Sequence, residues 1–229
     1  MQIHSMKYQT YIFDLDGTLL DTLGDLAASC NHALKVNGMP ERSTDEVRQF
    51  VGNGVAKLIE RAVPEGTTDE RREAVLQSFR RHYLEHAEDS TLPYDGILPM
   101  LQELRAKGCR VAVVSNKFMA ATQALCRHYF GDLVEVAIGE DQHIRKKPHA
   151  DAVEEALRQL GADKETAVYV GDSDVDIMTA RNSGLPCISV LWGFRDRPFL
   201  EEHGATVFVA HPRELVGADP RVCPKAPIC

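Results

Sequence analysis

The stretch that decides the fold is Tyr11-Ile12-Phe13-Asp14-Leu15-Asp16-Gly17-Thr18-Leu19-Leu20-Asp21-Thr22. Its aromatic and β-branched start predicts a buried strand. An ionised carboxylate is costly inside a strand, so we expect this strand to end at Asp14. Side chains two residues apart on an extended segment face the same way, so Asp14 and Asp16 can share one crevice. Gly17 then allows a sharp turn and a close approach of the backbone to a ligand.

Two carboxylates in one crevice need compensation. At a separation of about 4 Å and an effective dielectric of 20 they repel by roughly 4 kcal/mol. A helix N-terminus returns only about 0.3–1 kcal/mol, so either one carboxyl is protonated or a cation is bound. The simpler alternative is that these acids cap a turn, which Asp and Gly favour. Their position directly behind an apolar strand favours a metal-assisted acid pair.

The run from Asp14 to Thr18 resembles the first motif of the haloacid dehalogenase-like phosphatases. This resemblance implies that Asp14 attacks phosphorus and that Asp16 acts as general acid and base. It also places Thr18 among the candidate substrate-binding residues.

The composition restricts the class of protein. The chain has 229 residues and a formal net charge of −8, which gives no electrostatic help toward nucleic acid or an anionic membrane. No apolar run is long enough to span a bilayer, and residues 1–6 lack the pattern of a signal peptide. The six cysteines form no Cys-x-x-Cys pair, which suits a reducing cytoplasm. We therefore expect a cytoplasmic protein; whether it is a monomer or a homodimer stays open at this point.

The hydrophobic pattern changes twice along the chain. Residues 22–91 carry apolar stripes at helical spacing, including a capping box from Ser43 to Glu46 and a helix after Thr68. From residue 92, near-continuous apolar runs alternate with helical segments, as in a parallel sheet covered on both faces. The strands are expected at 111–114, 134–138, 167–170, 187–191 and 206–209, with helices at 98–104, 120–129, 152–160 and 177–183.

These patterns predict an α/β fold, a Rossmann-like parallel sheet with helices on both faces and an inserted all-helical cap. Residues 1–21 and 92–229 would form the core and residues 22–91 the cap. The crossings near Leu20–Asp21 and 92–95 would act as hinges. Ligands of open parallel sheets bind beyond the carboxyl ends of the strands, so polar clusters there are candidate site residues.

Ser115, Asn116 and Lys117 follow a predicted strand, where hydroxyl and amide groups can donate to a phosphate. Read alone, such a run is a common turn. Arg145-Lys146-Lys147-Pro148 could equally be a solvated basic run. However, Pro148 holds the preceding residue extended and able to point inward, so Lys147 is preferred over Lys146. These two clusters are similar to the family's second and third motifs, in which Ser115 would grip the phosphoryl group and Lys147 would offset negative charge.

Asp172 and Asp176 lie in Gly171-Asp172-Ser173-Asp174-Val175-Asp176 after another predicted strand. Acids at a helix N-terminus are favourable without any metal, but three exceed what one cap needs. The run resembles the family's fourth motif, with Asp172 as metal ligand and Asp176 orienting Lys147 or a metal-bound water. Oxygen ligands select a hard cation, and Mg²⁺ fits Asp14, Asp172 and the backbone carbonyl of Asp16.

All these motifs follow the order of the family over nearly the whole chain. The helical insertion resembles the family's small cap, with Gly52, Asn53 and Gly54 as its substrate-reading loop, although a simple helix break remains open for that loop. Together with Asn116 and Lys117 it resembles the phosphoglycolate phosphatase branch. The resemblance implies Mg²⁺-dependent hydrolysis of a small phosphorylated metabolite through an aspartyl-phosphate.

Alternatives remain open at this point. A phosphomutase, or a nucleotide or pyrophosphate hydrolase, would share the core, whereas a dehalogenase would not need Asp16. A phosphoacceptor signalling module also has an acidic α/β core but would not carry the helical insertion. His82 and His86, four apart on a helix, could form half a zinc site, but no third ligand is expected nearby. Arg195, after a strand end, could reach a substrate carboxylate.

Overall fold

The computed structural model describes residues 7–216. Within them lies a six-stranded sheet in the order β5-β4-β1-β6-β7-β8. Neighbouring strands are parallel throughout, so the predicted α/β class is confirmed. The bounds are β1 Thr10–Phe13, β4 Arg110–Phe118, β5 Val136–Glu140, β6 Ala167–Gly171, β7 Cys187–Val190 and β8 Phe208–Val209.

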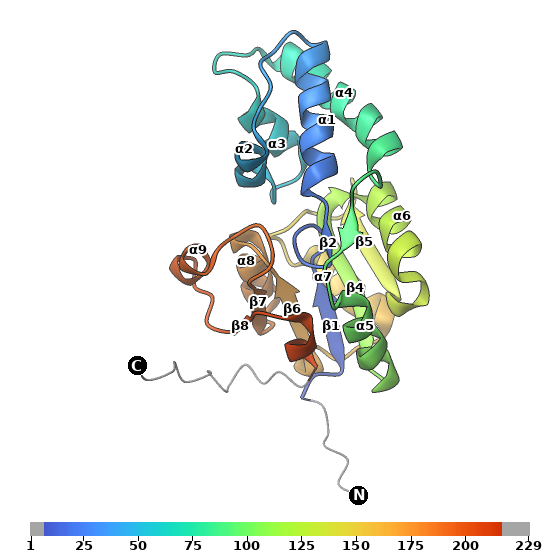
Figure 1. The fold of residues 1–229 in the computed structure, drawn as a ribbon. Helices are drawn as coiled ribbons and strands as arrows, with labels where there is room; N and C mark the ends of the chain where they lie inside the picture. The colour runs from blue at the N-terminus through green and yellow to red at the C-terminus, as the bar shows by residue number, and fades with distance from the viewer. Residues whose placement is uncertain (1–6, 217–229) are drawn as a thin grey trace, which may run out of the picture.

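Each face of the sheet has its own apolar core because successive strand side chains point to opposite sides. Tyr11 and Phe13 pack on one face against α5 (Ile97–Ala106) and α6 (Met119–Phe130). Ile12 packs on the other against α7 (Asp151–Leu160), together with a residue of α8 (Asp174–Ser183). Figure 1 shows these helices around the central strands. The sheet is therefore buried on both faces, as its near-continuous apolar strands require.

A separate apolar core lies among α1 (Leu23–Val36), α2 (Thr44–Phe50), α3 (Val55–Ala62) and α4 (Asp69–His86). Figure 1 places these helices beyond the sheet, at the upper end of the molecule. Local signals set their starts: Ser43 and Glu46 form the capping box, and the Thr68 side chain accepts from the Arg71 amide. We propose that residues 22–91 act as a cap over the core.

The two chain crossings form a short ribbon that the sequence did not indicate. β2 (Leu20–Asp21) pairs antiparallel with β3 (Leu92–Pro93) at the positions expected to be hinges. Beside it, buried Asp25 accepts hydrogen bonds from the amides and hydroxyls of Ser90 and Thr91. Burial alone would raise the pKa of Asp25, but these hydrogen bonds outweigh it and lower that pKa. Asp25 thus ties the outgoing crossing to the returning one.

Replacement of Asp25 by asparagine is expected to lower the free energy of unfolding by about 2–4 kcal/mol, because an amide nitrogen would face donors that now share a carboxylate. Because the pKa of Asp25 is lower in the folded state, the ionised carboxylate stabilises the fold fully above the unfolded-state pKa of about 3.9. This stabilisation is lost as the pH falls through the lower folded-state pKa. The difference between wild type and Asp25→Asn should therefore shrink below about pH 4. Urea unfolding at pH 7 and pH 3 measures the free energy of unfolding of wild type and of Asp25→Asn. An equal difference between the two proteins at both pH values would contradict the stabilising role of the Asp25 carboxylate.

Other elements differ modestly from expectation. β4 runs on through Phe118, with a register irregularity against β5 between Val114 and Phe118, so Ser115–Lys117 lie within its range. The helix α9 (Arg197–Glu202) was not predicted. No helix in residues 7–216 is long and apolar enough to cross a membrane. The two C-terminal cysteines, Cys223 and Cys229, and the predicted absence of a signal peptide concern residues outside the described range.

Candidate active site

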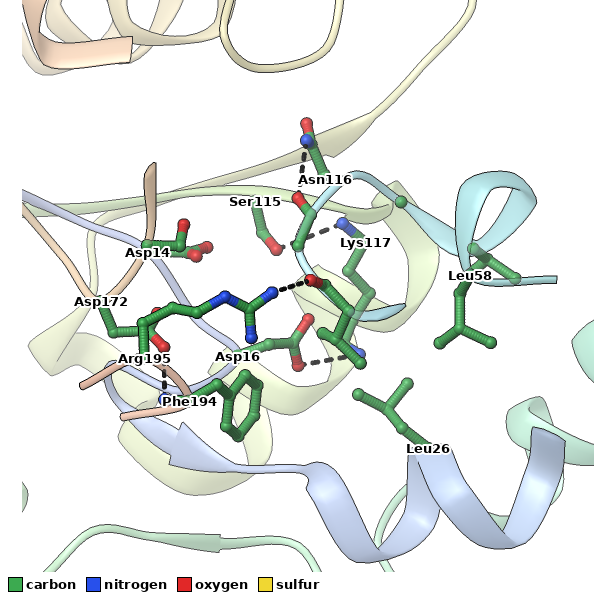
Figure 2. A pocket seen from close by; sticks show the side chains of 15 residues that line it. Asp14, Asp16, Leu26, Leu58, Ser115, Asn116, Lys117, Asp172, Phe194 and Arg195 are labelled. Atoms are coloured by element: carbon green, nitrogen blue, oxygen red, sulfur yellow. Dashed lines mark hydrogen bonds and ion pairs between the residues drawn. The ribbon is translucent and has the colours of Figure 1, made fainter. Parts of the chain in front are cut away.

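The predicted clusters meet at the carboxyl ends of the central strands. Asp14 follows β1, Asp172 follows β6, and Ser115 lies toward the end of β4. Because β4, β1 and β6 are adjacent, parallel strand ends bring these side chains into one region (Figure 2). A cavity of about 40 Å³ lies between them and the helical cap. Its lining includes these three residues and Asp16, Gly52, Gly54, Asn116 and Lys117.

The acid cluster, which we define as Asp14, Asp172 and Asp176, is buried. One carboxylate oxygen of each lies within 4.8 Å of the others. Burial, then the charge of Asp176, raises the pKa of Asp14 well above its usual range. The same two causes, in the same order, raise the pKa of Asp172 to about 7. Such a cluster needs positive charge nearby.

Asp172 is held from two sides. Its Oδ1 accepts from the Thr18 hydroxyl (3.2 Å) and its Oδ2 from the Phe194 amide (2.7 Å). Thr18 is fully buried and is not among the cavity-lining residues. The structure thus places Thr18 on Asp172 rather than where a substrate would lie. A Cβ at Gly17, whose φ is +84°, would collide with Asp172, so glycine permits this close approach.

Lys147 lies between two acids. Its Nζ is 2.8 Å from both Asp14 Oδ1 and Asp176 Oδ1, and 3.1 Å from the Tyr169 hydroxyl. Burial alone would lower the pKa of Lys147, but Asp14 and Asp176 outweigh it and raise the pKa above the usual value. Lys147 is therefore an ammonium that neutralises part of the acid cluster. The Lys147 side chain points inward, toward the acid cluster, as expected from the sequence.

Asp176 has little capacity left for a ligand. Oδ1 accepts from Lys147 and Tyr169, while Oδ2 accepts from the Asp172 amide and from the amide and hydroxyl of Ser173. This set occupies both oxygens with donors. The contact with Lys147 is one of the two roles expected from the sequence, and it orients the ammonium toward Asp14.

Asp16 has a different partner. Its Oδ1 is 3.0 Å from Lys117 Nζ, which also donates to the Tyr83 hydroxyl of α4 (2.8 Å). Burial raises the pKa of Tyr83 to about 12, against the opposing charge of Lys117, so Tyr83 is a neutral phenol. Lys117 thus links the candidate acid–base residue to a cap helix. It lines the cavity beside Ser115, whose Oγ accepts the Lys117 amide (3.2 Å).

The residues present suit a divalent cation. Asp14 and Asp172 bring buried oxygens close together, and their raised pKa values reflect repulsion that a cation would relieve. Carboxylate and carbonyl oxygens without nitrogen or sulfur select a hard ion such as Mg²⁺. In residues 7–216 no other group of histidine, cysteine or acidic ligands converges in this way.

A sequence model of the haloacid dehalogenase-like hydrolases matches residues 11–190, which include the acid cluster, Asp16, Ser115, Lys117 and Lys147. The chain belongs to the haloacid dehalogenase-like hydrolase family. The resemblance drawn from the motifs is therefore confirmed.

Two relatives and one solved structure within the haloacid dehalogenase-like family are named as phosphoglycolate phosphatases. The chain is 37% identical over 188 residues to the phosphoglycolate phosphatase of Aquifex aeolicus, covering 80% of this chain and 84% of that protein. It is 33% identical to the phosphoglycolate phosphatase of Caulobacter vibrioides, with 90% and 89% covered. The crystal structure of a candidate phosphoglycolate phosphatase from Lactobacillus delbrueckii subsp. bulgaricus superposes with a TM-score of 0.89 at 36% identity, covering 93% of this chain and 100% of that one.

Part of this haloacid dehalogenase-like site was not visible in the sequence. Tyr83 and Tyr169 contact Lys117 and Lys147 across large sequence separations, and tyrosines in apolar helices and strands read as core. Arg195 was noted only as a possible substrate contact. Its position after a strand end was the available signal, because loops at that edge line the site.

The cap histidines also have an unexpected neighbour. His32 of α1 stacks on His82 with ring centroids 4.1 Å apart, and His82 stacks on His86 at 4.2 Å. The spacing of His82 and His86 gives no sign of this third histidine, which lies beside them because α1 packs along α4. Burial, then the charges of His32 and His86, lowers the pKa of His82. The ring nitrogens do not converge into a metal-binding group.

Proposed function

We propose that this chain is a Mg²⁺-dependent phosphatase that hydrolyses 2-phosphoglycolate through an aspartyl-phosphate at Asp14. The observation that carries the proposal is the buried acid cluster with Lys147 placed 2.8 Å from Asp14. Family membership supports the reaction class, and relatives named phosphoglycolate phosphatase at 33–37% identity support the substrate.

The residues divide the reaction between them. Asp14 attacks phosphorus in line, and the ester oxygen leaves with a proton from Asp16. Asp16 then removes a proton from water, which attacks the acyl-phosphate and frees Asp14. Ser115 and Lys147 donate to the oxygens of the transferring group. Asp14, Asp172 and the backbone carbonyl of Asp16 would hold Mg²⁺, which supplies charge neutralisation at the phosphoryl group.

Two features favour a small anionic leaving group. The cavity is small, about 40 Å³, which favours a small leaving group over a sugar or nucleoside. Apolar side chains of the cap, including Leu26, Val55 and Leu58, cover it, while Lys117 and Arg195 are the cations in its lining. We propose that Lys117, Asn116 and the loop of Gly52, Asn53 and Gly54 contact the substrate carboxylate end.

A panel of phosphomonoesters tests the proposal directly. Release of inorganic phosphate from 2-phosphoglycolate should exceed that from hexose phosphates and nucleotides by at least about tenfold in kcat/KM. Excess chelator should abolish it, and added Mg²⁺ should restore it. Equal turnover with chelator would contradict the metal, and preferred transfer to a sugar phosphate would indicate a mutase.

Replacement of Asp172 by asparagine should raise the Mg²⁺ concentration giving half-maximal activity by roughly 10–100-fold. The amide keeps the shape of the side chain but removes the charge that the cation pairs with. Thermal stabilisation by Mg²⁺ should weaken in parallel, which provides a readout independent of turnover. The matched control is Asp174→Asn, because Asp174 lies outside the acid cluster and outside the cavity lining. An unaltered Mg²⁺ titration in Asp172→Asn would remove this ligand from the scheme.

A further inference from the structure

The end of α2 and the loop after it are held by an unusual set of hydrogen bonds. Every backbone carbonyl from Arg48 to Asn53 accepts from a side chain. Arg195 supplies three of these bonds: Nη1 donates to Arg48 O (2.8 Å), and Nη2 to Gln49 O (3.3 Å) and Val51 O (2.9 Å). Figure 2 shows the guanidinium reaching across the cavity toward this loop.

The remaining carbonyls have separate donors. Asn116 Nδ2 donates to Gly52 O (3.1 Å) and Lys146 Nζ to Asn53 O (3.4 Å), both from the core. Arg61 of α3 donates to Phe50 O (2.8 Å) from within the cap. We call the bonds from the three core residues Arg195, Asn116 and Lys146 the carbonyl clamp. Each comes from a different loop or strand end that borders the acid cluster.

The chemistry of the α2 terminus explains why the carbonyls of Arg48, Gln49 and Val51 attract the Arg195 guanidinium. The last carbonyls of a helix have no intrahelical partner, and the helix dipole makes this end negative. A guanidinium offers several donors in a fixed fork, so one arginine can serve several carbonyls at once. Arg195 is half-buried, and neither it nor Lys146 has a salt bridge to a carboxylate in the described chain.

Arg195 also stands next to the acid cluster. The preceding residue, Phe194, donates its amide to Asp172 and packs its ring against the cap core. Arg195 lines the same cavity as Asp14 and Asp16. A single dipeptide therefore touches a candidate metal ligand on one side and the loop over the cavity on the other.

We propose that Arg195 is a positioning residue that holds the α2 terminus, and with it residues 51–54, over Asp14. This inference rests on the proposed phosphatase function for its kinetic consequences but not for its structural ones. The hydrogen bonds hold the loop in the closed arrangement in which it covers a small substrate. Without the Arg195 hydrogen bonds, the α2 terminus loses its main connection to the core, while the β2–β3 crossings still join cap and core.

The test compares Arg195→Met, Arg195→Lys and the control Arg197→Met. Arg197 is exposed and lies two residues away; it pairs with Glu201 at 3.7 Å, stacks over the Phe208 ring and does not line the cavity. For Arg195→Met we expect KM for 2-phosphoglycolate to rise about tenfold or more, whereas kcat/KM for 4-nitrophenyl phosphate should not fall, because this substrate is too bulky for the covered cavity and reacts only with the loop displaced. Arg195→Lys should fall between, because an ammonium keeps the charge without the fork.

Hydrogen exchange provides the second readout and requires no substrate. Amides of residues 48–54 should exchange faster in Arg195→Met, while those of α1 and of the sheet keep their rates. Unchanged exchange at 48–54 would overturn the proposal. Faster exchange throughout the cap with a lowered Tm would also overturn it, because it indicates a general stabilising role. If 2-phosphoglycolate is not hydrolysed at all, the substrate assignment fails, and the exchange experiment still decides the role of Arg195.

Discussion

Replacement of Asp14 by asparagine is expected to lower kcat by about 10⁴-fold or more, because an amide does not form the acyl-phosphate on which both half-reactions depend. The amide oxygen can still accept from the Leu15 amide, which now donates to Asp14 Oδ1 at 2.7 Å. The fold should therefore survive, and Tm should change by only a few degrees. Phosphate release under saturating Mg²⁺ measures the loss.

The control for this variant is Asp132→Asn. Asp132 is exposed and precedes β5, at the end of the sheet opposite the acid cluster. The kcat of Asp132→Asn should therefore match that of wild type. Rapid quench with ³²P-labelled substrate should trap label on wild-type protein and none on Asp14→Asn. Turnover that persists in Asp14→Asn at more than a few per cent of wild type would require another nucleophile.

Replacement of Lys147 by methionine should have the second-largest effect, a fall in kcat/KM of about 10²–10³-fold. The thioether fills similar space but leaves two buried carboxylates, Asp14 and Asp176, without their shared ammonium. Lys147 lowers the pKa of Asp14 against larger effects that raise it, so its removal should raise that pKa further. Because the nucleophile must be ionised, the acidic limb of the pH–rate profile should move to higher pH.

Lys107→Met is the matched control, since Lys107 is exposed at the end of α5 and pairs with Glu103 at 3.1 Å. Its pH–rate profile should overlay that of wild type. A Lys147→Met profile with the same acidic limb and only a scaled rate would contradict the electrostatic role. If Lys147→Met fails to fold, Lys147→Arg, which keeps the charge, should fold and retain the position of the limb.

Much of the fold could be predicted because its signals are local. Apolar runs such as Val111–Val114 predicted the buried strands. A capping residue such as Ser43 predicted the start of a helix to within one residue of its observed position. The order of the motifs placed Asp14, Asp172 and Lys147 at one sheet edge, since parallel strands emerge at one end. The ribbon of β2 and β3 was missed because two residues on each side carry no periodic pattern. The helix α9 was missed although Asp196, its N-cap, was an available signal.

The contacts around the site were less predictable. Lys117 was expected to contact substrate, but its present partners are Asp16 and Tyr83, and nothing in the spacing of these residues fixes that choice. Thr18 lies in the first motif, yet its hydroxyl turns to Asp172 because the Gly17 turn directs it there. Side-chain partners across a fold depend on packing of distant elements, which a single sequence does not encode in any local pattern.

The carbonyl clamp binds backbone carbonyls of residues 48, 49 and 51–53 and does not involve the side chains of those residues. Gln49 is exposed and contributes only its carbonyl to Arg195. The clamp therefore places no constraint on the side chain of an exposed residue such as Gln49. Side chains at such positions can be exchanged while the carbonyl clamp stays intact. Saturation mutagenesis at Gln49 should therefore yield a high proportion of active variants.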